Sequence, residues 1–301
     1  MPPFPLLEVP HLPLSHILKD MSIQELLNLS FKQNDIQDFL KMIPIRSGGY
    51  SIYLYNDGIR IKMGKQNFSF ECSDQDKSII LDGLNKNLDY FKETFPGEIN
   101  KLDVNPSIYY DQLDRIPKEC HILSIGSETD QELADFETIL QQINFKSGLI
   151  LKGPKSMKTE NSKLFHVDYL KIGNSEWMTS SILESLQNEI IHLQFTKFTD
   201  SEINSFLLNL KNGNGNNRLK LMTIERENAW NMDEIVKELD TFITEKQSFP
   251  MDLTVLHADF LPFSTCRGIE IYNSFDFITE NGTRVSVDNP LLLIRIFIWS
   301  P

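Results

Sequence analysis

The chain has 301 residues and a formal net charge of −13, from 29 basic and 42 acidic side chains. Hydrophobic residues make up 41% and charged residues 24%, close to ordinary globular usage, which excludes wholesale disorder. The length fits one large domain or two ordinary ones. Nucleic acid and anionic membranes are disfavoured as main partners, because both require clustered Lys and Arg.

Three cysteines, Cys72, Cys120 and Cys266, lie far apart and form no Cys-x-x-Cys pair. This usage is typical of reduced, mostly buried thiols and gives no support for a zinc cage. The N-terminus has no basic region followed by a long apolar run, and the most apolar stretch, 291–299, is too short to span a bilayer. We therefore expect a cytoplasmic or nuclear protein without cofactor, metal or membrane partner.

Residues 3–45 carry three short helical patterns. Apolar residues recur at three- or four-residue spacing in 14–21, a capping box at 22–25 opens a second helix, and a third covers 34–43. Three helices in so short a segment bury little surface. We expect this segment to pack on the rest of the chain, on a partner, or on both.

A period-two pattern follows. It predicts strands at 50–55 and 59–63, joined by the turn signal 56–58, and a third strand at 67–72. Asp74 can then cap a helix whose apolar face extends to Phe91.

From residue 118 the pattern alternates between strand and helix, which indicates right-handed crossovers and a mostly parallel sheet. The expected strands are 122–126, 148–151, 169–173, 190–195 and 219–224. The expected helices are 129–143, 179–186, 199–210 and 231–243.

Leu170, Leu193 and Leu221 open similar apolar cores 23 and 28 residues apart. This spacing lies in the range of leucine-rich repeats, about 20–29 residues, and indicates an irregular, repeat-like α/β stack. Hairpins are expected to close the chain. Their strands are 269–272, 275–279, 284–287 and 292–299, with Asn281-Gly282 as a tight turn.

No arrangement typical of an enzyme is found. Six histidines are scattered, and neither His-Glu-x-x-His nor Gly-x-Ser-x-Gly occurs. The glycine-rich segment 213–217 follows a helix and precedes a strand, the reverse of a dinucleotide-binding loop, and we interpret it as a helix end and turn. An enzyme with a degenerate site would need a histidine paired with a carboxylate in a pocket.

Two stretches resemble a known family. The first reads Phe4-Pro5-Leu6-Leu7, then Leu12-Pro13-Leu14-Ser15-His16-Ile17-Leu18, then Glu25-Leu26-Leu27-Asn28-Leu29-Ser30, and resembles an F-box. The second runs from Asp200-Ser201-Glu202 to Arg218-Leu219-Lys220-Leu221. It resembles the F-box-associated (type 2) region of the F-box family that is expanded in nematodes.

The resemblance implies an F-box at 3–45 and an α/β substrate-recruiting domain at 46–301. It also implies a non-catalytic substrate receptor of an SCF-type ubiquitin ligase, which binds the Skp-type adaptor directly, the cullin indirectly, and an unknown protein target. Loops 153–164 and 211–217 are candidates for target binding. The alternative is a leucine-rich-repeat-like scaffold that binds a protein outside any ligase. The implied adaptor-binding residues are Leu6, Leu7, Pro10, Leu14, Ile17, Leu18, Leu26 and Leu29.

Overall fold

The fold comes from a computed structural model of residues 1–301. The structure describes 49–55, 58–63, 66–71, 77–94, 97–105, 110–126, 133–153, 162–250 and 268–299, with seven single residues before them: His16, Leu18, Asp20, Met21, Glu25, Leu26 and Leu40. The chain divides into a first compact unit, 1–121 with 142–144, and a second, 122–141 with 145–301. The expected domain boundary at 45 and 46 lies outside the described residues.

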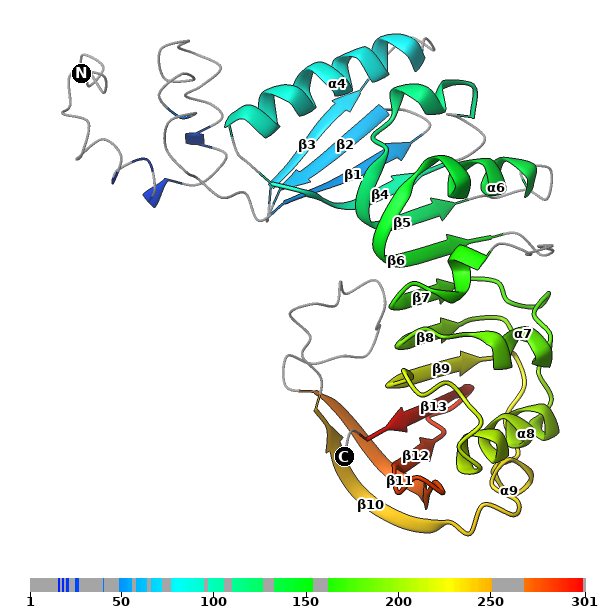
Figure 1. The fold of residues 1–301 in the computed structure, drawn as a ribbon. Helices are drawn as coiled ribbons and strands as arrows, with labels where there is room; N and C mark the ends of the chain where they lie inside the picture. The colour runs from blue at the N-terminus through cyan, green and yellow to red at the C-terminus, as the bar shows by residue number, and fades with distance from the viewer. Residues whose placement is uncertain are drawn as a thin grey trace. The chain divides into compact units, whose positions relative to one another are not determined.

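The first unit holds a small mixed sheet and a long helix (Figure 1). Its strand order is β3-β2-β1-β4; β2 is antiparallel to both neighbours, and β4 is parallel to β1. The elements are β1 (Tyr50–Tyr55), β2 (Gly58–Met63), β3 (Gln66–Glu71), α4 (Lys77–Thr94), β4 (Ile99–Val104) and the 3₁₀ helix η2 (Tyr110–Arg115).

The three strands predicted from the period-two pattern are confirmed as β1, β2 and β3, and the helix predicted after them is confirmed as α4. Ile52 and Ile61 are paired across β1 and β2 and are fully buried, as alternation requires. The cap at Asp74 and the turn residues 56–57 lie outside the described residues. Strand β4 was not predicted, because Asn100, Lys101 and Asp103 make half of its sequence polar and interrupt the alternation of apolar residues.

The second unit is a larger mixed sheet, ordered β5-β6-β7-β8-β9-β13-β12-β11-β10. Neighbouring strands from β6 to β9 run parallel to one another. Strand β13 is antiparallel to β9, and neighbouring strands from β13 to β10 are antiparallel as well. The elements are β5 (Glu119–Gly126), α6 (Leu133–Gln142), β6 (Asn144–Lys152), η4 (Ser162–Phe165), β7 (Tyr169–Ile172), α7 (Ser180–Ser185), β8 (Ile190–Leu193), α8 (Asp200–Lys211), β9 (Leu221–Glu225), α9 (Met232–Ile235), β10 (Phe242–Phe249), β11 (Ile269–Ile278), β12 (Arg284–Asp288) and β13 (Leu293–Ile298).

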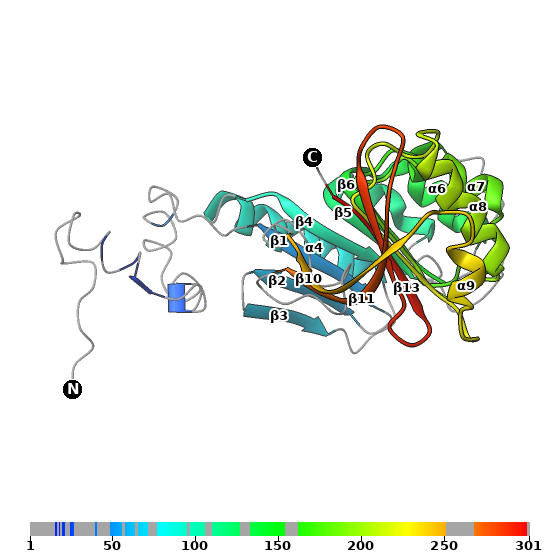
Figure 2. The ribbon, with the colours of Figure 1, turned by 90° about the horizontal axis from the view of Figure 1, so that it is seen from below.

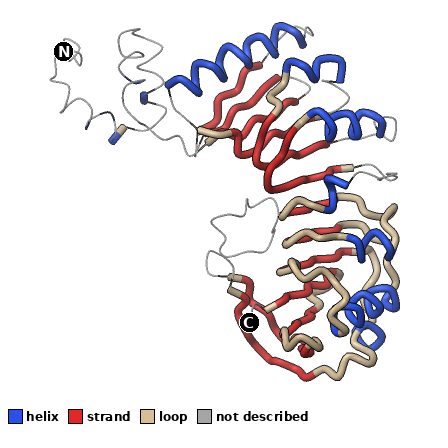
Figure 3. Tube along the Cα trace, in the orientation of Figure 1, coloured by secondary structure: helices blue, strands red, loops and turns tan. Residues whose placement is uncertain are grey.

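The expected α/β class, with central parallel strands and antiparallel strands at the C-terminal end, is therefore confirmed. Figures 1 and 2 show α7, α8 and α9 on the same side of the strands, and Figure 3 shows how short these helices are beside the loops that flank them. Opposite them, Ile190, Leu221 and Phe297 form a buried cluster with Phe249 of β10 and residues of β11.

Two expectations in this unit are wrong. The helix predicted over 231–243 ends at Ile235, and Phe242 begins β10, because Glu238 and Asp240 adopt positive φ (65° and 52°) and break the helix. The separate strands 269–272 and 275–279 are one continuous strand, β11, which passes through Asn273 at φ 52°.

The three repeat-spaced leucines do not occupy equivalent positions. Leu170 is paired with Ile191, and Leu193 is paired with Ile172. Leu193 therefore lies on the same face of the sheet as Leu170 but two residues further along the strands. Leu221 is paired with Ile190, so it lies on the opposite face from Leu193. The spacing was misleading because each short strand carries several aliphatic residues, and any of them can imitate a repeat position.

Candidate functional site

Two of the eight expected adaptor-binding residues lie in the described part of the chain. Leu18 and Leu26 are helical, and each side chain is only 1% exposed. Both therefore contribute to the interior, as leucines that hold small helices together do. The other six lie outside the described residues: Leu6, Leu7, Pro10, Leu14, Ile17 and Leu29.

In the second unit, the two ends of the parallel strands β7, β8 and β9 carry different features. The amino edge consists of the residues that precede these strands, such as Asp168, Glu189 and Lys220. The carboxyl edge consists of those that follow them, such as Gln194 and Arg226. Loops at strand ends often carry binding residues, because the sheet holds such loops in fixed positions.

A pocket of about 270 Å³ lies at the amino edge. Buried Leu219 and Val285 contribute an apolar floor, and Asn217 and Asn281 lie on the rim with Trp299. The candidate loop 211–217 supplies part of the wall, beside the turn between β11 and β12. The volume is just below the usual range of small-molecule sites and fits a single side chain of a bound peptide.

The loop after α8 is tightly fixed. Asn212 caps the helix and Gly213 adopts φ 70°, so the interpretation of 213–217 as a helix end and turn is confirmed. The buried side chain of Asn216 donates to the carbonyl of Asn188 at 2.7 Å and accepts from the backbone N–H of Arg218 at 2.9 Å. The pocket wall is thus preformed.

The charges around the pocket are paired with one another. Glu189 lies between Lys220, at 2.6 Å, and Arg218, at 3.5 Å. Arg218 also contacts Asp168 at 2.5 Å. Because the cations already have carboxylate partners, the pocket favours a neutral or apolar group over a free anion.

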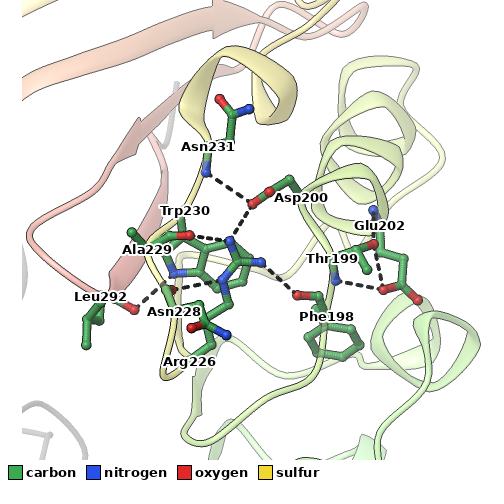
Figure 4. A network of polar contacts seen from close by, with 10 residues as sticks. All are labelled: Phe198, Thr199, Asp200, Glu202, Arg226, Asn228, Ala229, Trp230, Asn231 and Leu292. Atoms are coloured by element: carbon green, nitrogen blue, oxygen red, sulfur yellow. Dashed lines mark hydrogen bonds and ion pairs between the residues drawn. The ribbon is translucent and has the colours of Figure 1, made fainter.

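Arg226 organises the carboxyl edge (Figure 4). Its guanidinium donates to the carbonyls of Phe198, Asn228 and Ala229 at 3.1, 3.0 and 2.6 Å, and to Asp200 Oδ1 at 2.8 Å. It also stacks on Trp230, with Cζ 3.7 Å from the ring centroid.

The same network extends to the neighbouring elements. Asp200 Oδ1 also accepts from the backbone N–H of Asn231, and Trp230 Nε1 donates to the carbonyl of Leu292 at 2.9 Å. Thr199 and Glu202 form a reciprocal capping box at the start of α8, which confirms the predicted helix start. The turns around β9, α8 and β13 are therefore held as one rigid edge.

A histidine–hydroxyl pair lies inside the sheet. His192 Nδ1 is hydrogen bonded to Thr223 Oγ1, and the imidazole is 1% exposed. Burial, with a smaller effect from Lys171, lowers the pKa of His192 to about 4. The pair cannot meet a substrate, and an imidazole of this pKa is a weak general base at neutral pH. We interpret the pair as structural.

Cys120 is also buried. Burial raises the pKa of the Cys120 thiol to about 12, so it stays protonated. In the described part of the chain, no three His, Cys, Asp or Glu side chains lie close enough to hold a metal ion. None of the described helices is both long and apolar enough to cross a membrane.

Comparison of the chain with protein-family models, curated proteins and solved structures finds no match.

Sequence reasoning did not find the carboxyl edge. Arg226 and Trp230 lie in a polar stretch without a motif, and their contacts to Asp200 and Leu292 join residues far apart in the chain. A signal was present in Pro290-Leu291-Leu292, where two leucines follow a proline in a turn between strands. Of the loops expected to bind a target, 211–217 lines the pocket, whereas 154–161 lies outside the described residues.

Proposed function

We propose that this chain is the substrate-recruiting subunit of an SCF-type ubiquitin ligase. In this proposal residues 3–45 dock on a Skp-type adaptor, and the second unit recruits a protein target. The chain carries out no chemistry itself; it acts by holding the target near a charged ubiquitin-conjugating enzyme, which raises the effective concentration of the reactants.

The observation that carries the proposal is the F-box-like sequence of residues 4–30, on a chain whose elements from residue 50 onward are α/β. Buried Leu18 and Leu26 fit helices that pack on one another. The adaptor-facing residues are then sought among Leu6, Leu7, Pro10, Leu14, Ile17 and Leu29.

The form of the second unit agrees with a binding platform. Strands β6 to β9 are neighbours in both sequence and space, and they run parallel. We interpret this arrangement as an irregular, leucine-rich-repeat-like stack, closed by the antiparallel strands β10 to β13. Such stacks bind proteins through extended surfaces.

The test is co-purification of the full chain with a Skp-type adaptor. The double variant Leu6→Asp/Leu7→Asp should lose adaptor capture, because two carboxylates cannot enter an apolar interface without a large desolvation cost. The exposed Lys197→Ala in the second unit is the control and should keep capture. Absence of capture by the unmodified chain would favour the alternative, a protein-binding scaffold outside any ligase.

A further inference from the structure

Three large apolar side chains are exposed at the carboxyl edge of the second unit. Phe195 follows β8 and is 48% exposed, and Leu291 and Leu292 precede β13 and are 90% and 41% exposed. Apolar residues of this size exposed together mark interaction sites more often than isolated ones do.

Backbone pairing places these segments close together. The N–H of Thr196 donates to the carbonyl of Glu225 at 3.0 Å, and on the other side of that strand the N–H of Arg226 donates to the carbonyl of Leu292 at 3.3 Å. Neighbouring strands lie about 5 Å apart, so the two apolar segments are separated by about 10 Å. One extended segment of a partner can contact both.

Two of these exposed residues have an unfavourable backbone conformation. Phe195 has φ 50° and Leu291 has φ 68°, the left-handed region that bulky residues avoid. The turn at Leu292 is held by Trp230 Nε1 and by Arg226, in the network of Figure 4. Strained positions that the surrounding structure holds in place cluster at binding sites.

The polar groups around these residues are mostly acidic. Gln194 donates to Glu225 at 3.1 Å, Glu176 contacts Lys197 at 3.0 Å, and Glu227 is exposed. The guanidinium of Arg226 is already hydrogen bonded to Asp200 and three carbonyls. Among the described residues at this edge, the carboxylates of Glu176, Glu225 and Glu227 outnumber the ammonium of Lys197, so the rim favours a cationic partner.

We propose that Phe195, Leu291 and Leu292 form a docking surface for an extended protein segment whose aliphatic side chains are flanked by Lys or Arg. This inference rests on the proposed function in one respect, namely that the segment belongs to the recruited target. The pocket at the amino edge, with its paired charges, lacks this acidic rim.

The experiment measures fluorescence anisotropy of labelled probe peptides with the full chain. The probe Gly-Arg-Arg-Leu-Leu-Arg-Arg-Gly should bind about tenfold tighter than versions with Glu in place of Arg or Ser in place of Leu. Its affinity should fall with added salt, because part of the attraction is between exposed charges.

Variants assign the site. Phe195→Asn and Leu291→Asn should each weaken binding of the arginine-flanked probe about tenfold, and both should fold because Asn tolerates positive φ. Ile243→Thr, which removes a 67% exposed apolar side chain from β10, is the matched control and should bind normally.

Equal binding of the acidic and basic probes, unchanged binding by both Asn variants, or no binding of the basic probe would overturn the docking surface. Each of these results is separable from failure of the proposed function, which is read from adaptor capture and does not involve these residues.

Discussion

The side chain of Arg226 holds the carboxyl edge together in the way that a core residue holds a fold together. Its guanidinium satisfies three backbone carbonyls and one carboxylate while it covers the face of Trp230. Lysine has the same charge but lacks the planar fork, so it can satisfy only part of this set. The residue therefore acts as a hub that connects α8, the segment after β9 and the turn before β13.

We predict that Arg226→Lys lowers the free energy of unfolding by about 2–3 kcal/mol, because several partly buried carbonyls lose their donors. Urea denaturation of the full chain measures this change. Lys197→Ala, which removes an exposed ion pair with Glu176, should change stability by less than about 1 kcal/mol. Equal effects of the two variants would contradict a structural role for the guanidinium.

His192 makes stability depend on pH. Its pKa is lowered from 6.5 to about 4 in the folded chain, mainly by burial, so the unfolded chain binds the proton more readily. The contribution of neutral His192 to the free energy of unfolding is fully present above pH 6.5 and is lost as the pH falls towards 4.

Between these two pH values, the unfolding free energy should fall by about 1 kcal/mol per pH unit on account of His192. His192→Gln should reduce this slope, whereas the matched variant His166→Gln, at an exposed position, should retain it. Denaturation curves at several pH values test the difference. An identical slope in His192→Gln would show that the imidazole is not held neutral by burial.

Two glycines among the C-terminal strands, Gly268 and Gly282, both have positive φ but differ in the space available for a side chain. Gly268 has φ 116°, and a Cβ there would lie 2.6 Å from the carbonyl oxygen of Phe249. Gly282, in the turn between β11 and β12, has φ 83° but has open space around it. Both positions favour glycine, but only the first lacks room for a side chain.

We therefore predict that Gly268→Ala costs about 3 kcal/mol or more of stability, whereas Gly282→Ala costs about 1 kcal/mol. Thermal unfolding of the two variants measures the difference. A cost for Gly268→Ala no larger than that for Gly282→Ala would mean that β10 and β11 can separate without penalty at this point.

Local patterns were sufficient where an element is defined by its own residues. The alternation in β1 and β2, the capping box of Thr199 and Glu202, and the Asn281-Gly282 turn all have their cause within a few residues. Local patterns failed where an element is defined by pairing with residues far away in the sequence. Strand β4, in which half of the residues are polar, is defined by its parallel pairing with β1, and β10 is defined by its pairing with β11.

At the scale of the whole molecule, the fold class followed from the order of strand and helix signals, but the functional surfaces did not. The pocket at the amino edge brings the turn after α8 together with Thr283 and Trp299, and the docking surface brings Phe195 together with Leu291. No local pattern joins residues 70–100 positions apart, because their proximity arises from the placement of β13 beside β9.

The two ends of the chain have separate tasks in the proposed receptor. In that proposal, residues 3–45 bind the adaptor, and the second unit holds the target on a preformed edge. A rigid edge suits this task, because little conformational entropy is lost when the target binds.

The central claim, that residues 3–45 dock on a Skp-type adaptor, is tested most directly by calorimetric titration of the full chain with purified adaptor. We predict saturable binding of one adaptor per chain, with a Kd of about 1 μM or tighter. Absence of binding at adaptor concentrations of about 100 μM would contradict the receptor assignment. The second unit would then be a protein-binding scaffold that acts outside a ubiquitin ligase.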